Sequence, residues 1–316
     1  MGLDVNSLNL LGFASNHGAR FDRTLSIGRA SICMPDEALA EFLQASGRAD
    51  MLSNVAHLTE SRYFEVILRE VFGALDVKSV DVSAYEGASM IHDMNEPIGE
   101  HERFSVVLDF GCLEHVFNFP VAVDNVVRMC EDDGHILHYL PANNCCGHGF
   151  YQFSPELFFS LYSDERGFEG TRVFFVEWQD APGVWYEIAA PRDVRARVNI
   201  VNDWEGYLLV MTRRTRKAIS PLAESPQQSD YLDMWGEEHA PMWDERMGSS
   251  QGESASFEKA HTFRRLKSLV KQLLPFVGLE KLGWRTALRL AHRRRSVRRR
   301  RSDVERQRVA DLIAKP

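Results

Sequence analysis

The stretch FSVVLDFGCLEHV, residues 104–116, decides the fold that the sequence predicts. Its run 105–108 is short and apolar, and Asp109 and Gly111 follow it. Such a run is typical of a strand that is buried on both faces, as in a parallel sheet. A helical pattern then begins at Leu113. A buried strand, a turn with glycine and a helix form one unit of a parallel α/β sheet, in which ligands bind beyond the carboxyl ends of the strands. We therefore expect any active site to lie at this turn.

Three sequence features resemble a known family: the segments Leu113-Glu114-His115-Val116 and Gly134-His135-Ile136-Leu137, and Pro141 after them. They are similar to class I S-adenosylmethionine-dependent methyltransferases with a type 11-like domain, and the resemblance covers about residues 20–215. It implies a Rossmann-like α/β fold, with a doubly wound, mostly parallel sheet of seven strands that includes a C-terminal antiparallel strand. It also implies S-adenosylmethionine as the cofactor and methyl transfer as the reaction.

Glycines lie at the end of the first predicted strand, residues 24–29, and just after the fourth, residues 105–108. The family has a Gly-rich loop after its first strand, where bare backbone lets the cofactor approach, and here Gly28 is the single glycine, with Arg29 beside it. The alternative is an ordinary turn between a strand and a helix. Gly111 holds the corresponding place after the fourth strand. The resemblance thus predicts cofactor contacts at Gly28, Arg29 and Gly111.

Acidic residues lie at or near the ends of the second predicted strand, residues 77–83, and of the short third strand within residues 87–95. In nucleotide-binding sheets an acid at the end of the second strand accepts hydrogen bonds from ribose hydroxyls, and Asp81 stands there with Ser83 close by. The resemblance implies that Asp93 binds the adenine amino group and that Met94 covers the ring. The alternative for both acids is a local role in a turn. We expect all four residues to contact the cofactor.

Candidate catalytic residues follow the fourth predicted strand and the fifth, residues 135–140. Methyl transfer is an in-line displacement that needs a base when the acceptor is a hydroxyl group. His148, between two glycines on a loop expected to be flexible, is the first candidate base, and His115 at a helix start is the second. Asn143, with Asn144 beside it, is predicted to orient the acceptor or the cofactor, and Tyr151 completes the candidate set. The alternative for each is a structural role in its loop or turn.

Motifs that the sequence lacks limit the class of methyl acceptor that we expect. The sequence has no Asn-Pro-Pro-Tyr-type motif after the fourth strand and no Pro-Cys nucleophile, which disfavours methylation of nucleic-acid bases. It also has no P-loop and no nucleophilic serine elbow. We expect O- or N-methylation of a small-molecule, sugar or lipid-linked (glycan) acceptor. Two alternatives stay open: a catalytically silent binding module, because the first strand ends in one glycine, and an interaction protein that works through its C-terminal tail.

Cysteine content and hydropathy indicate the compartment. The five cysteines are an odd number without paired spacing, which is typical of reduced thiols in a cytosolic protein. No zinc-binding pattern is present, so no metal is predicted. The sequence has no run of about eighteen apolar residues and no signal peptide at its start. The predicted location is cytoplasmic, with a peripheral position at the inner face of the membrane as an extension of this prediction.

Charge divides the chain. Of its 37 Lys and Arg residues and 45 Asp and Glu residues, 18 bases but only four acids lie from Lys259 onward, so this part carries +14 and the rest −22. The predicted segments are a loosely attached lead-in (1–20), the methyltransferase-like domain (21–216), an acidic disordered linker (217–258) and a basic, partly helical tail (259–316).

Leucines recur at helical spacing among Arg and Lys in residues 259–301. A basic amphipathic helix of this kind is typical of segments that bind an anionic membrane surface or an acidic partner. Two alternatives remain: docking of the tail on its own acidic domain, and binding to the phosphate backbone of a nucleic acid, which is the least favoured of the three.

Overall fold

The computed structural model describes residues 2–178, 184–194, 198–229 and 304–308, and all of these belong to one compact unit. Its strands are β1 (Arg23–Ile27), β2 (Asp76–Asp81), β3 (Met90–Ile91), β4 (Phe104–Asp109), β5 (Cys130–Pro141), β6 (Phe168–Glu177), β7 (Val184–Ile188), β8 (Gly206–Arg214) and β9 (Val304–Arg308). Its helices are α1 (Val5–Asn16), α2 (Asp36–Ala45), α3 (Val55–Glu60), α4 (Glu65–Glu70), α5 (Phe119–Met129), α6 (Pro155–Leu161) and α7 (Pro191–Val194). Short 3-10 helices are η1 (Ala49–Asn54), η2 (Leu113–His115) and η3 (Asp164–Arg166).

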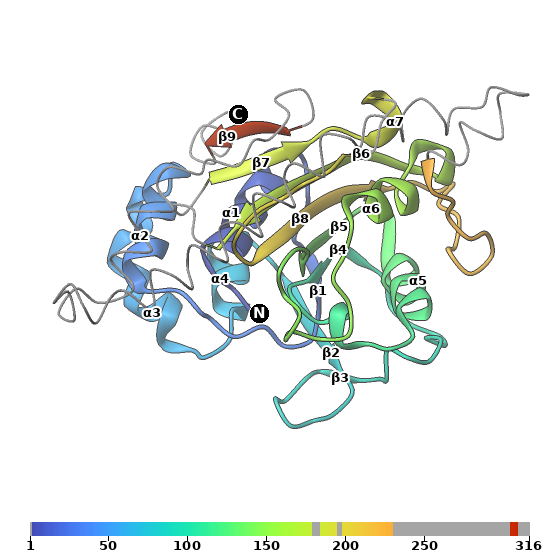
Figure 1. Cartoon of the computed structure of the whole chain (residues 1–316). Helices are drawn as coiled ribbons and strands as arrows, with labels where there is room; N and C mark the ends of the chain where they lie inside the picture. The colour runs from blue at the N-terminus through green and yellow to red at the C-terminus, as the bar shows by residue number, and fades with distance from the viewer. Residues whose placement is uncertain (1, 179–183, 195–197, 230–303, 309–316) are drawn as a thin grey trace, which may run out of the picture. The chain divides into compact units, whose positions relative to one another are not determined.

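The described strands form one sheet in the order β3-β2-β1-β4-β5-β8-β6-β7-β9 (Figure 1). Strands β1 to β5 pair in parallel, whereas β8 runs antiparallel to both of its neighbours, β5 and β6. The prediction of a doubly wound, mostly parallel sheet with a C-terminal antiparallel strand is therefore confirmed. The sheet goes beyond the seven predicted strands, because β7 and β9 extend it past β6 in antiparallel pairing.

Helices cover both faces of this sheet, with α1 to α4 on one face and α5 and α6 on the other (Figure 1). Alternating residues of β8 show the two cores, because Leu209 and Met211 pack with the first group of helices and Leu208 and Val210 with the second. Every residue of β4 is buried, as its continuous apolar run predicts. The central strand is thus enclosed along its whole length. The turn with Gly111 follows its carboxyl end.

The N-terminal segment is an integral part of the core, so the prediction of a loosely attached lead-in is wrong. Asp4 begins α1 with a capping box, in which its Oδ1 accepts a hydrogen bond from the Ser7 backbone at 2.9 Å and its own backbone N–H donates to Ser7 Oγ at 2.8 Å. Phe13 is fully buried, with its ring centroid 5.3 Å from that of Phe174 and 6.2 Å from that of Trp185. Helix α1 therefore packs on β6 and β7.

The compact unit also continues past residue 216, where the domain was predicted to end. The Ile219 backbone donates to Arg166 O at 2.9 Å, and the Ser229 backbone donates to Glu156 Oε1 at 2.7 Å. The rest of the predicted linker, 230–258, and the basic tail apart from β9 lie outside the described residues. Among the helices of the described chain, none is long and apolar enough to cross a membrane.

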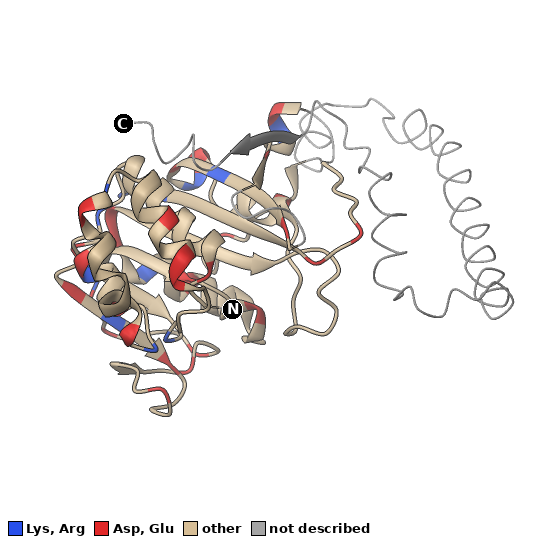
Figure 2. Cartoon of the chain, turned by 90° about the vertical axis from the view of Figure 1, so that its left-hand side faces the viewer, with Lys and Arg blue, Asp and Glu red and all other residues tan. Residues whose placement is uncertain are grey.

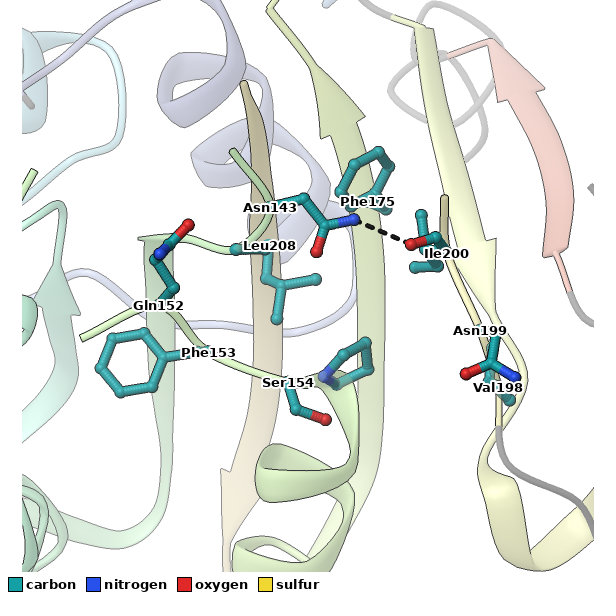
Figure 3. A pocket seen from close by; sticks show the side chains of 11 residues that line it. Asn143, Gln152, Phe153, Ser154, Phe175, Val198, Asn199, Ile200 and Leu208 are labelled. Carbon is teal, nitrogen blue, oxygen red and sulfur yellow. Dashed lines mark hydrogen bonds between the residues drawn. The ribbon is translucent and has the colours of Figure 1, made fainter. Parts of the chain in front are cut away.

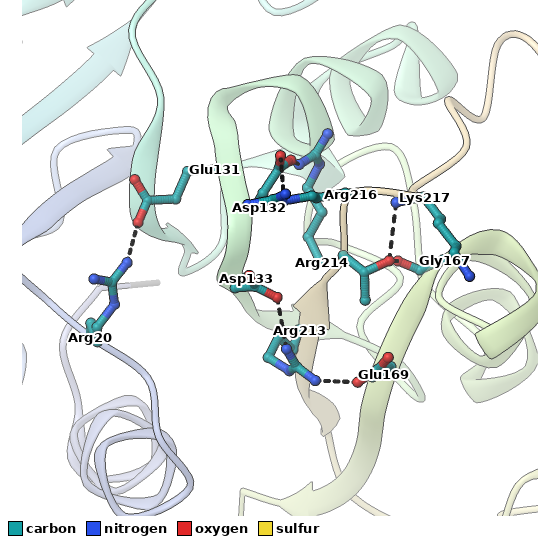
Figure 4. Close-up of polar contacts among 11 residues, drawn as sticks. Arg20, Glu131, Asp132, Asp133, Gly167, Glu169, Arg213, Arg214, Arg216 and Lys217 are labelled. Carbon is teal, nitrogen blue, oxygen red and sulfur yellow. Dashed lines mark hydrogen bonds and ion pairs between the residues drawn. The ribbon is translucent and has the colours of Figure 1, made fainter.

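Ion pairs gather at the amino end of β5, on the edge of the sheet away from the candidate site. Arg20 binds Glu131 at 2.5 Å, Arg213 binds Asp133 at 2.9 Å, and Arg214 of β8 binds Asp132 (Figure 4). Figure 2 shows acidic residues along the helices and loops of the described chain, with basic residues among them. Most of the pairing partners are partly exposed, so each pair contributes little to stability.

Candidate active site at the carboxyl ends of the strands

The register of the parallel strands brings the predicted cofactor positions to one edge. Ile27, the last residue of β1, lies opposite Val80 of β2 and opposite Asp109 of β4. Gly28 follows Ile27, and Asp81 follows Val80. Because the two strands run in parallel, Gly28 and Asp81 therefore lie side by side at the carboxyl edge. Two of the predicted cofactor residues are thus brought together by backbone pairing alone.

The turns after β1 and β4 touch each other. Gly28 has φ of +71° and Gly111 has φ of +88°, a conformation that residues with side chains rarely adopt. A Cβ on Gly28 would lie 3.6 Å from Cys112 Sγ, which is ordinary van der Waals contact. The turn after β1 therefore packs directly against the Cys112 side chain in the turn after β4. Both turns present bare backbone at this edge, which fits the close approach of a ligand.

Arg29 uses its side chain within the protein. Its Nε binds Glu65 Oε1 at 2.6 Å, and its Nη1 donates to the backbone oxygen of Glu86 at 2.7 Å. The guanidinium also lies 3.9 Å from the ring centroid of Tyr63. These contacts tie the turn after β1 to α4 and to the loop after β2, so Arg29 shapes the edge of the site.

The two predicted acids differ in their surroundings. Asp81 is half-buried and accepts a hydrogen bond from the Ser83 backbone at 3.2 Å. Asp93 is exposed, and its Oδ1 accepts from the backbone and the side chain of Asn95, at 2.9 and 2.8 Å, which lowers the pKa of its carboxyl group. Asp93 thus forms the local turn that was its alternative role. Met94 is only 5% exposed and packs in the core under α5.

A buried hydrogen-bonded chain, which the sequence did not reveal, lies behind the turn after β4. Asp109 Oδ1 accepts from the backbones of Cys112 and Leu113, at 3.1 and 3.2 Å, and Asp109 Oδ2 lies 2.8 Å from His138 Nδ1. On the other side of the ring, His138 Nε2 lies 2.8 Å from the Tyr162 hydroxyl. Burial, and then Asp109, raise the pKa of Tyr162 well above its usual value, so its hydroxyl stays a donor.

The structure brings the two candidate bases together around a third residue, Glu114. This side chain is fully buried in η2, and its Oε1 lies 3.2 Å from His148 Nε2 and 3.6 Å from His115 Nε2. The two imidazole ring centroids are 5.1 Å apart. Glu114 Oε2 is buried and has no hydrogen-bond partner among the described residues. A carboxyl group and two imidazoles therefore converge at one point beside the turn after β4.

The loop that carries His148 is held firmly against Glu114. The backbone N–H groups of Phe150 and Tyr151 both donate to Glu114 O, at 2.7 and 3.3 Å, and the Tyr151 hydroxyl donates to Phe117 O at 2.6 Å. A Cβ on the intervening Gly149 would lie 2.8 Å from Glu114 O. The loop was expected to be flexible, but these contacts fix its position, and Tyr151 takes part in fixing it.

Burial sets the charge state of this cluster. Burial, and then the nearby Asp109, raise the pKa of Glu114 to about 8. Burial also lowers the pKa of His115, with a smaller contribution from His148, and burial lowers the pKa of His148 itself. Both imidazoles are therefore neutral at pH 7, and each offers a nitrogen lone pair. Burial and three acids, Asp109, Glu114 and Asp81, raise the pKa of Cys112, so its thiol stays protonated.

A cavity of about 320 Å³ opens beyond the carboxyl end of β5. It is lined by residues of the loop after β5, the start of α6, β6, β8 and the segment 198–200, and Figure 3 shows Asn143 and Gln152 at its wall. Asn143 Nδ2 donates to Ile200 O and to Asn202 Oδ1, both at 2.9 Å. Of the predicted catalytic residues, Asn143 lines this cavity, whereas the two histidines and Tyr151 lie outside its lining.

Comparisons with known proteins give similarities of fold. No family model matches this chain, and no curated protein does. Among solved structures, the N-methyltransferase NodS from Bradyrhizobium japonicum WM9 matches at 15% identity and a TM-score of 0.33, covering 67% of this chain and 94% of that one. A SAM-dependent methyltransferase from Thermotoga maritima matches at 13% identity and a TM-score of 0.30, covering 66% and 92%. The trans-methyltransferase CalH, solved with S-adenosylhomocysteine, matches at 12% identity and a TM-score of 0.32, covering 67% and 55%. With identities and scores this low, the matches carry no inference about activity.

Proposed function

We propose that the described domain is an S-adenosylmethionine-dependent methyltransferase. The observation that supports this most is the meeting of Gly28, Asp81 and Gly111 at the carboxyl edge of a doubly wound sheet. Ligands of such sheets bind at this edge, next to the point where the strand order reverses. In this sheet the order reverses between β1 and β4, which is where the two left-handed glycine turns lie.

The residues at this edge fit the cofactor. Gly28 and Gly111 present backbone without side chains, and half-buried Asp81 offers carboxylate oxygens for ribose hydroxyls. Asp93 stays in the proposal as the residue for the adenine amino group, because both hydrogen bonds from Asn95 fall on its Oδ1. When bound, S-adenosylmethionine supplies an electrophilic methyl group on a sulfonium and leaves as a neutral thioether.

The acceptor in this proposal is an oxygen or nitrogen of a small molecule, sugar or lipid-linked compound. As the acceptor atom bonds to the methyl carbon, an acceptor hydroxyl must lose its proton. Glu114, His115 and His148 form the group of ionisable side chains beside the turn after β4, and the two neutral imidazoles are able to handle that proton. Asn143, on the cavity wall, would orient the acceptor.

One observation favours a binding module without catalysis as a second candidate. The Gly28 N–H already donates to Val80 O at 2.8 Å, and Arg29 is held by Glu65 and Glu86, so the turn after β1 offers few donors for a ligand. Such a module would bind the cofactor and leave it unreacted.

Isothermal titration of S-adenosylmethionine and S-adenosylhomocysteine into the full chain tests the proposal. We expect micromolar binding of both compounds, weakened about tenfold by Asp81→Asn, since that change removes the charged acceptor for ribose hydroxyls. Asp76→Asn, at the opposite end of β2, is the matched control and should bind as the wild type does. Absence of binding by a chain with native circular dichroism would overturn the proposal.

A further inference from the structure

Glu114, His115 and His148 are spaced as metal ligands are. One ligand atom from each lies within 4.8 Å of the other two, and the carboxylate oxygen is 3.2 and 3.6 Å from the two imidazole nitrogens. In a tetrahedral zinc site with bonds of roughly 2.0–2.2 Å, neighbouring ligand atoms lie roughly 3.3–3.5 Å apart. Two edges of the triangle are thus close to the lengths that a metal ion imposes.

The carboxyl group of Glu114 also lacks a partner that its burial demands. Its side chain is fully buried, and Oε2 makes no hydrogen bond within the described part of the chain. A buried carboxyl oxygen without a partner is costly, and such atoms are rare in native structures. His115 and His148 are partly exposed, with 51% and 37% of their side-chain surfaces accessible, so an ion can reach the cluster from solvent.

The backbone is built to hold the third ligand in place. His148 comes from the loop after β5, and two backbone hydrogen bonds to Glu114 O dock that loop on η2. Gly149 makes this approach possible, because its φ of +71° and the short distance to Glu114 both exclude a side chain. The three ligands are therefore positioned before any ion binds.

We propose that Glu114, His115 and His148 bind one divalent transition-metal ion. Two imidazoles and one carboxylate, which Glu114 would provide by releasing its proton as the ion binds, are a donor set that binds catalytic Zn²⁺, which keeps its fourth position open. Zn²⁺ is accordingly the best match, and the open position takes an oxygen ligand.

The role of this ion rests on the proposed function. An acceptor hydroxyl bound at the open position would have its pKa lowered by the metal and would release its proton to solvent water, so that neither histidine need take it. Phe117 and Phe150 follow two of the ligands by two residues each and are 73% and 67% exposed, with ring centroids 6.0 Å apart. An exposed aromatic pair two residues along the chain from these ligands favours an acceptor oxygen carried on an apolar or aromatic ring.

Metal binding is tested on the full chain with Cys33 and Cys146 changed to Ser, because both thiols are exposed and would bind metals on their own. After treatment with a chelator, the protein is titrated with Co²⁺ and then with Zn²⁺. We expect one equivalent of Co²⁺ with the visible absorption of a four-coordinate site, displaced by one equivalent of Zn²⁺.

Single substitutions locate the site. His115→Gln and His148→Gln should each weaken Zn²⁺ binding by more than about tenfold, since losing even an outer-shell partner of a metal ligand costs that much. His57→Gln is the matched control, because His57 also lies beside carboxylates, 2.7 Å from Glu70 Oε1, but on the surface. Unchanged Zn²⁺ affinity in both ligand variants, or no binding by wild-type protein with native circular dichroism, would overturn the proposal.

Two hydroxamates probe the open position of the Co²⁺ form. Acetohydroxamate should shift its visible spectrum, and benzohydroxamate should do so at a lower concentration, with Phe150→Ala removing that difference. No shift with either compound contradicts an open position. Titration of S-adenosylmethionine is independent of these measurements, so a chain that binds Zn²⁺ but not the cofactor keeps this site and overturns the proposed function. Cofactor binding without metal binding overturns this site alone.

Discussion

Asp109 and His138 form a hydrogen bond of 2.8 Å, from Nδ1 to Oδ2, between two side chains that are both fully buried. The bond joins the carboxyl end of β4 to β5, and the second oxygen of Asp109 holds the backbone of the turn that leads into η2. Glu114 lies on η2, so this buried pair helps to fix the position of Glu114 and of its cluster with His115 and His148.

We expect Asp109→Ala to lower the free energy of unfolding by on the order of 3–5 kcal/mol. The change leaves His138 and two backbone N–H groups without an acceptor in the protein interior, and breaking a buried pair from one side has costs of this size. Urea denaturation of the wild type and the variant measures the difference. Asp133→Asn removes a surface ion pair with Arg213 and should cost less than about 1 kcal/mol. Equal effects of the two substitutions would contradict a structural role for the buried pair.

Local sequence signals were sufficient for the strands and turns that the sheet requires. The apolar run of β4 and its glycine turn are where the sequence predicted them. Each of these signals lies within a few neighbouring residues. The candidate residues at the strand ends could be predicted for the same reason, because parallel pairing aligns the strand ends automatically.

Features that depend on distant contacts could not be predicted in this way. Helix α1 is buried all round from Ser7 to Ala14, so its sequence has no amphipathic period by which a packed helix is recognised. His138 and His148 reach Asp109 and Glu114 across 29 and 34 residues, because they arrive on or after the next strand of the sheet. Residue patterns over such separations are specific to single families and do not transfer to this chain, so the polar chain and the three-residue cluster became visible only in three dimensions.

Acid should destabilise the protein through His135. This side chain is 5% exposed on β5, and burial, with smaller contributions from Arg213 and Arg20, lowers its pKa to about 4. The unfolded chain, with a pKa near 6.5, binds more protons between about pH 6.5 and 4, so the stabilisation is complete above this window and is lost as the pH falls through it. The loss approaches on the order of 3 kcal/mol at the acid end.

Urea midpoints at pH 7.5 and pH 5 measure this effect. The wild type should lose stability between the two conditions, and His135→Leu, which cannot titrate, should lose clearly less. His57→Gln changes an exposed histidine and should follow the wild type. The same loss in His135→Leu as in the wild type would show that other groups cause the acid sensitivity.

Two glycines that flank His148 should respond differently to the same substitution. Gly149→Ala places a methyl group 2.8 Å from Glu114 O at a φ of +71°, so the loop must move away, and we expect Zn²⁺ affinity to fall together with about 1–3 kcal/mol of stability. Gly147→Ala meets no atom within 4 Å and should leave both quantities unchanged. Metal titration and urea denaturation of the pair measure this. Equal Zn²⁺ affinities would mean that the docking of the loop does not position His148.

Finally, the N-terminal helix should contribute as much to stability as a central element does. Phe13 of α1 is fully buried between Phe174 and Trp185, so Phe13→Ala should cost about 3–5 kcal/mol of unfolding free energy through lost burial and a cavity. Phe117→Ala is the same chemical change at a side chain that is 73% exposed, and it should cost less than about 0.5 kcal/mol. Urea denaturation compares the two variants. If both lost the same small amount, α1 would be only loosely attached, as its sequence alone suggests, and shortened chains that begin after it would be sound material for the binding experiments.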